Sequence, residues 1–224
     1  MPHWRVSLDK SILMTETQEI FQLFSKVVST DYLGLKEPER IKTLNILKSI
    51  SYSSAGTGTE EDNLPYTSDE RYLLDLPKLH FLKYKLLRFV NDYMHNTLRY
   101  EHNNFKITTS WVAKTTPGTM SHWHNHNNCF FSGVYYVDTY EKCGRLRFSN
   151  FETKRYEPTV DEHNILNGRE FYLEPSNDKI IMFPAEIYHM VAKNNSEHDR
   201  YSIAFNVIPI GTIGQGDSQM IIKD

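Results

Sequence analysis

The spacing of hydrophobic residues changes about halfway along the chain. In the first hundred residues, apolar side chains recur at intervals of three and four, which is the period of one helical face. This spacing predicts helices from Thr15 to Val28, less clearly from Pro38 to about Ile50, and most clearly from Leu79 onward. The last helix would carry on one side Leu82, Leu86, Phe89, Val90 and Tyr93.

A polar segment separates the second and third of these predicted helices. Residues 51–72 read SYSSAGTGTEEDNLPYTSDERY, a Gly- and Ser-rich stretch without periodicity. We therefore expect a mobile surface loop there.

After Phe105 the hydrophobic residues gather in short β-rich runs. These runs are FKITTSWVAK, FFSGVYYV, RLRF, KIIMFP, HMVA and YSIAFNVIPI, separated by Gly, Pro and Asn turns. Many short strands without intervening helices predict an antiparallel barrel or sandwich. We predict one mainly β domain over residues 1–224, in which a helical layer and loop (1–104) buttress a β core (105–224).

Composition narrows the functional classes. The chain has 224 residues and a formal net charge of −3 with both signs mixed, so no nucleic-acid partner is expected. No run of about 20 apolar residues predicts a membrane span, and the first residues do not resemble a signal peptide. Two cysteines, Cys129 and Cys143, are too few for a disulfide scaffold. We expect reduced thiols and a cytoplasmic protein; the sequence leaves a homodimer open.

Three histidines alternate just before an aromatic run, in SHWHNHNNCFFSGVYYV from Ser121 to Val137. Residues two apart on a strand face the same side, so His124 and His126 could share a metal ion. His122 competes for this role, because it forms a second pair with His124. His189, at the start of another predicted strand, is the expected third ligand. Imidazole suits Fe, Zn, Cu and Ni alike, so these ligands do not identify the metal.

A basic residue and a hydroxyl follow the distal histidine. Arg200 lies eleven residues after His189, and Ser202 lies two positions further on the same strand face. A fixed guanidinium beside a hydroxyl is a good receptor for a carboxylate. The sequence therefore predicts a pocket for a metal ion and an acid.

These residues resemble the Fe(II)/2-oxoglutarate-dependent oxygenases, whose fold is a double-stranded β-helix, a jelly-roll barrel related to the cupins. The resemblance is carried by HNHNNCFFSGVYY (124–136), FPAEIYH (183–189) and RYSIAFN (200–206), and it is closest to a subgroup with an H-x-H motif. That motif favours His126 over His122. The run SGVYYV also resembles prolyl hydroxylases. The resemblance implies Fe(II), 2-oxoglutarate as cosubstrate, O2, and a peptidyl or small organic substrate.

The resemblance also implies roles for individual residues. His124, His126 and His189 would hold the iron, and Arg200 and Ser202 would hold the distal carboxylate of 2-oxoglutarate. By similarity to prolyl hydroxylases, the hydroxyl of Tyr136 would donate to the cosubstrate; Ser132, on the same strand face, and Asn206 would also line its pocket. The sequence departs from the superfamily at His126, where the usual ligand is a carboxylate. Three histidines leave the site one negative charge short.

Two alternatives use the same residues. A cupin-type metalloprotein would not use 2-oxoglutarate, but the cupin glutamate is replaced by Phe130 or Phe131 and the Arg200–Ser202 pair would have no role. A catalytically silent module could hold a small acid or peptide in the same pocket. Release of succinate from 2-oxoglutarate by the Fe(II)-loaded protein distinguishes these alternatives.

Overall fold

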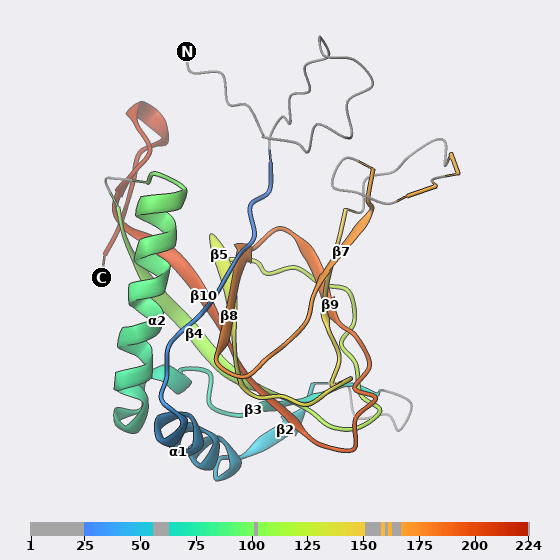
Figure 1. The fold of residues 1–224 in the computed structure, drawn as a ribbon. Helices are drawn as coiled ribbons and strands as arrows, with labels where there is room; N and C mark the ends of the chain where they lie inside the picture. The colour runs from blue at the N-terminus through green and yellow to red at the C-terminus, as the bar shows by residue number, and fades with distance from the viewer. Residues whose placement is uncertain are drawn as a thin grey trace.

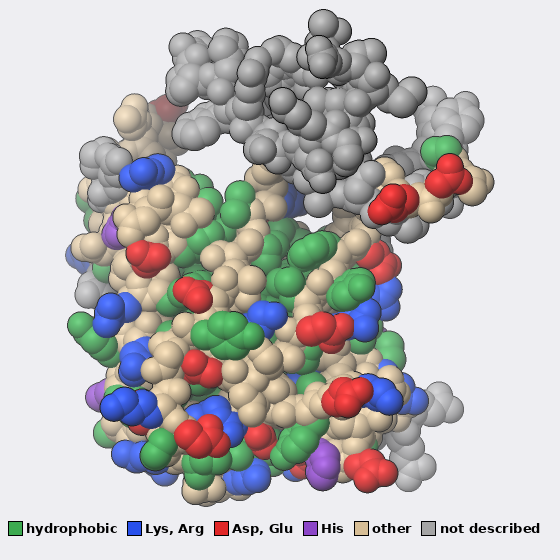
Figure 2. All heavy atoms as spheres, viewed as in Figure 1, with side chains coloured by type: hydrophobic (Ala, Val, Ile, Leu, Met, Phe, Trp, Pro, Cys, Tyr) green, Lys and Arg blue, Asp and Glu red, His purple; other side chains and the backbone are tan. Residues whose placement is uncertain are grey.

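Two antiparallel sheets face each other, and two helices cover the outer side of the larger sheet (Figure 1). The computed structural model describes residues 25–55, 63–100, 103–150, 158–159, 161–162 and 167–223. Within them, no helix combines the length and apolar character needed to cross a lipid bilayer. On the face drawn in Figure 2, acidic and basic side chains lie intermingled, in keeping with the mixed composition.

The larger sheet has the strand order β1-β8-β5-β10-β4-β3-β2, and β11 pairs with β10. Its strands are β1 (Ser29–Tyr32), β2 (Tyr52–Ser54), β3 (Tyr66–Ser68), β4 (Asn104–Thr115), β5 (Phe131–Asp138), β8 (Lys179–Pro184), β10 (Arg200–Ile213) and β11 (Met220–Ile222). The smaller sheet has the order β7-β6-β9, with β6 (Leu146–Ser149), β7 (Glu170–Leu173) and β9 (Tyr188–Val191). The strands predicted after Phe105 are therefore confirmed, and β7 and β11 are additional.

Two of the three predicted helices are present. Helix α1 (Glu37–Lys48) begins with acidic residues and Pro38 in its first turn, and the Glu39 carboxylate accepts a 3.0 Å hydrogen bond from the Lys36 backbone N–H. Helix α2 (His80–Asp92) continues as one π-helical turn (Tyr93–Thr97), and short 3₁₀ turns occur at Leu73–Asp75, Pro77–Leu79 and Gly216–Ser218. The helix expected from Thr15 lies mostly outside the described residues, and residues 25–28 are not helical.

The segment expected to be a loop contains two strands. Strands β2 and β3 pair with each other, and β3 pairs with β4, so this hairpin extends the larger sheet. The expectation of an unstructured loop over 51–72 was wrong for these strands. Lys114 of β4 stabilises the hairpin, because its Nζ lies 5.8 Å from the ring centroids of both Tyr52 and Tyr66.

Strand alternation gives the larger sheet two different faces. One face packs under the helices in a core formed by side chains such as Leu86, Val112, Tyr135, Ile203 and Phe205. The opposite face of β4, β5 and β10 lines a cavity between the two sheets. The ring of Phe205 lies against Gly133 of the neighbouring strand, where an added Cβ would lie 2.3 Å from that ring. Glycine is therefore required at this position.

Candidate metal and carboxylate site

The H-x-H segment lies beside β9 without forming a regular strand. Backbone hydrogen bonds join Ser121 to Val191, and the N–H of His126 donates to the carbonyl of Ala185. His124 and His189 form an isolated antiparallel bridge with reciprocal hydrogen bonds of 3.0 and 2.8 Å. The strand predicted for the histidines is thus absent, and pairing with β9 brings their side chains together.

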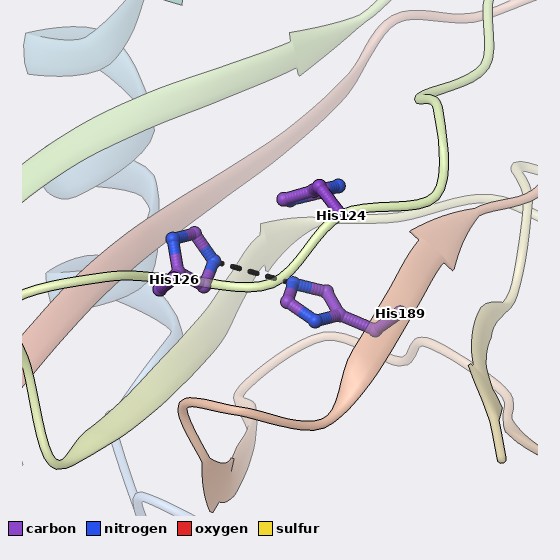
Figure 3. A group of neighbouring side chains, drawn as sticks. All are labelled: His124, His126 and His189. Atoms are coloured by element: carbon purple, nitrogen blue, oxygen red, sulfur yellow. Dashed lines mark hydrogen bonds between the residues drawn. The ribbon is translucent and has the colours of Figure 1, made fainter. Parts of the chain in front are cut away.

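The three imidazole rings point toward one another (Figure 3). One nitrogen from each of His124, His126 and His189 lies within 4.8 Å of the others. Nε2 of His126 is 3.2 Å from Nε2 of His189. Two nitrogens bound at right angles to one ion at about 2.1 Å would stand about 3 Å apart, so this pair is spaced for a shared metal. His122 is not part of the cluster.

Backbone contacts orient two of the rings. Nδ1 of His124 lies 2.8 Å from the carbonyl oxygen of His122, and Nδ1 of His189 lies 2.9 Å from that of Ile187. A carbonyl oxygen only accepts, so each Nδ1 must carry the proton. The lone pair of a neutral ring is then on Nε2, the atom available for a metal.

Burial keeps the two inner histidines uncharged. Desolvation, with a smaller effect from the neighbouring His124, lowers the pKa of His126 to about 4 and that of His189 to about 3. Metal binding requires neutral imidazole, so both rings could bind a metal ion near pH 7 without losing a proton.

The three histidines line a cavity of about 180 Å³. Tyr136, Ser132, Arg200 and Ser202 also line it, all from the cavity face of β5 and β10. Asn206 does not line the cavity. Its side chain accepts a 2.9 Å hydrogen bond from the Ser132 hydroxyl and donates to Thr109 at 3.0 Å. A cosubstrate role for Asn206 therefore stays a prediction without a direct contact.

Arg200 is buried, with 1% of its surface exposed. Its Nη1 donates to the carbonyl of Gly144 at 2.8 Å, and its Nη2 donates to the Thr115 hydroxyl at 2.7 Å. Its Nε has no partner, the one such buried side-chain atom among the described residues. These two acceptors and a third, the Cys143 carbonyl 3.4 Å from Nη1, are neutral, so the guanidinium presents an uncompensated charge and an unused donor. This arrangement fits a carboxylate ligand.

Sequence reasoning missed Thr115. It ends β4, is fully buried, and pairs with Arg200 in the strand register. Its role in fixing the guanidinium depends on that register, which hydrophobic alternation alone does not provide. The segment that contains β2 and β3 also contributes Ala55, Pro65 and Thr67 to the lining of the cavity.

Residues 109–206 match the model of a family described as "Putative 2OG-Fe(II) oxygenase". Similar solved structures include a prolyl-4-hydroxylase from Pseudomonas putida, with 14% identity, a TM-score of 0.57, and coverage of 81% of this chain and 93% of that one. A prolyl hydroxylase from Trichoplax adhaerens, in complex with a hypoxia-inducible-factor peptide fragment, has 16% identity, a TM-score of 0.55, and coverage of 81% and 83%.

HygX from Streptomyces hygroscopicus, with nickel and 2-oxoglutarate bound, has 11% identity, a TM-score of 0.59, and coverage of 82% and 83%. No curated protein matches the chain. The structural likeness confirms the double-stranded β-helix fold. The family match over residues 109–206 and the cluster of three histidines make this part of the chain similar to the Fe(II)- and 2-oxoglutarate-dependent oxygenases.

Proposed function

We propose that the protein hydroxylates a C–H bond of an organic or peptidyl substrate, with His124, His126 and His189 holding Fe(II) and Arg200 holding 2-oxoglutarate. When bound, iron and cosubstrate supply the oxidising chemistry: one oxygen atom of O2 ends in succinate and the other in the hydroxylated product, with release of CO2. Imidazole nitrogens are suitable ligands for iron.

The residues of the chain would bind 2-oxoglutarate and orient it in the cavity. The guanidinium of Arg200 takes the distal carboxylate, with its free Nε as an additional donor. The Ser202 hydroxyl, now 3.3 Å from the Ala113 carbonyl, is close enough along the same strand face to help. Tyr136, whose ring centroid lies 5.7 Å from the guanidinium carbon, walls the pocket and offers its hydroxyl. The apolar walls exclude water and strengthen these contacts.

One observation carries the proposal: the buried guanidinium of Arg200, with no acidic partner, lines the same cavity as the three histidines. A metal site alone, as in the cupin alternative, gives this charge no function. A buried charge without a partner is destabilising, so its presence implies a ligand that brings the opposite charge.

The test is a titration of the Fe(II)-loaded protein with 2-oxoglutarate without oxygen, followed by the visible absorption band of the complex. Arg200→Ala should weaken binding by about 30-fold or more, which corresponds to the roughly 2–5 kcal/mol lost when a buried charge partner is removed. Bound metal should stay at the parent level. His124→Ala and His189→Ala should lose the metal itself.

Arg147→Ala is the matched control, because Arg147 is partly exposed and pairs with Glu170 instead of lining the cavity. It should bind 2-oxoglutarate as the parent does. An unchanged titration in Arg200→Ala, or no absorption band in the parent, would refute the proposal. Succinate formation after oxygen is admitted then distinguishes an active enzyme from a silent binding module.

Two further features belong to this proposal. A cytoplasmic location is supported by Cys129 and Cys143, which form no disulfide. A peptidyl substrate is supported by the likeness to a prolyl hydroxylase whose structure contains a peptide fragment. Mass spectrometry of candidate peptides for a gain of one oxygen atom tests the second.

A further inference from the structure

The formal charges of the cavity residues, the metal ion and 2-oxoglutarate do not sum to zero. Among the described residues that line it, none is Asp or Glu, and Arg200 is the only residue with a permanent charge. Imidazoles that bind a metal through a lone pair are neutral. The chain therefore contributes one positive charge and no negative charge.

This inference rests on the function proposed above. A divalent metal ion adds two positive charges, and 2-oxoglutarate removes two. One positive charge remains in a cavity with walls such as Val134, Leu146 and Phe183. A carboxylate in place of His126 would have removed it. Taking an uncompensated charge out of water is strongly unfavourable, so the remaining charge favours one more anion.

We propose that the cavity, once it holds the metal and 2-oxoglutarate, binds one further monoanion, either a carboxylate of the substrate or a small free anion. Both sources share the same chemistry, a single negative charge next to a three-histidine metal face. The apolar residues of the smaller sheet, Leu146 and Val191, are suited to the carbon skeleton of a small carboxylic acid or an acidic side chain.

His126 is the residue that sets this charge. It lies between the metal-facing nitrogen of His189, at 3.2 Å, and the ring of Trp111, at a centroid distance of 5.9 Å. His126→Asp would add one negative charge at this position and neutralise the loaded cavity. His122→Asp makes the same change two residues earlier on the same segment but outside the cavity, and it is the matched control.

The experiment is calorimetric titration of protein saturated with Fe(II) and 2-oxoglutarate, without oxygen and at constant ionic strength. The probes are formate, acetate and chloride. We expect the parent and His122→Asp to bind one equivalent of anion. We expect His126→Asp to bind it about tenfold more weakly or worse, because a unit charge a few ångströms away opposes it. Metal content and the 2-oxoglutarate band are recorded for every variant.

The outcomes separate this inference from the proposed function. Failure of 2-oxoglutarate to bind the parent overturns both. Normal 2-oxoglutarate binding without any anion binding in the parent overturns the second-anion site alone, whatever His126→Asp does. Release of one proton when 2-oxoglutarate binds, with no anion uptake, also overturns it, because hydroxide then supplies the charge. Tighter binding of formate and acetate than chloride assigns the site to a substrate carboxylate, and the reverse assigns it to a free anion.

Discussion

Removing the Thr115 hydroxyl should test whether this side chain holds the Arg200 guanidinium in place before any carboxylate binds. Thr115 is fully buried, and its Oγ1 is the one side-chain acceptor of Arg200, 2.7 Å from Nη2. Thr115→Val keeps a β-branched side chain but leaves this nitrogen without a partner beside Nε, which already lacks one. An unsatisfied buried donor costs about 1–3 kcal/mol, and more when it is charged.

The expected result is a lower urea midpoint with an unchanged slope, and a melting temperature reduced by about 2–4 °C for each kcal/mol. Binding of 2-oxoglutarate should weaken as well, because the guanidinium is less firmly placed. Thr115→Ser keeps the acceptor and should stay close to the parent in both measurements. If Thr115→Val unfolds at the parent's urea concentration, the hydroxyl does not stabilise Arg200 and the reasoning is refuted.

Two other predictions follow from the same strands. Gly133→Ala should lower the free energy of unfolding by about 1–3 kcal/mol, because its Cβ would overlap the buried ring of Phe205; an unchanged thermal transition would contradict this. In the metal-free protein, the lowered pKa values of His126 and His189 mean that the unfolded chain takes up protons first as pH falls. Stability should therefore decline from about pH 6.5 toward pH 3, the folded-state pKa of His189, and urea titrations should show a smaller decline in a His126→Asn, His189→Asn double variant.

Periodicity predicted the elements that bury a regular hydrophobic face. Strand β8 has the predicted bounds, and α1 and α2 lie close to theirs. The missed strands β2 and β3 read YSS and YTS, which contain too few apolar residues for any pattern. They form strands because β3 pairs with β4 and Lys114 of β4 packs near their tyrosines. Tertiary contacts of this kind override local preference.

The parts of the candidate site that could be predicted are those that depend only on residue type and on strand alternation. The clustering of His124, His126 and His189 was expected from strand alternation, although a single bridge to β9 produces it. The positions of Arg200 and Ser202 followed from alternation on β10. Partners across strands did not follow, since they depend on register; Thr115 opposite Arg200 is the clearest case.

The bridge between His124 and His189 also bears on when the proposed metal site would form during folding. The two histidines are far apart in sequence, yet reciprocal backbone hydrogen bonds join them. Closing so long a loop has an entropic cost that must be met before the contact forms, so the bridge belongs to the late, non-local part of folding. A chain whose barrel is still open offers isolated imidazoles and holds a metal ion weakly. Because metal bound only to the native state does not stabilise earlier states, loading should slow unfolding and leave the rate of folding nearly unchanged.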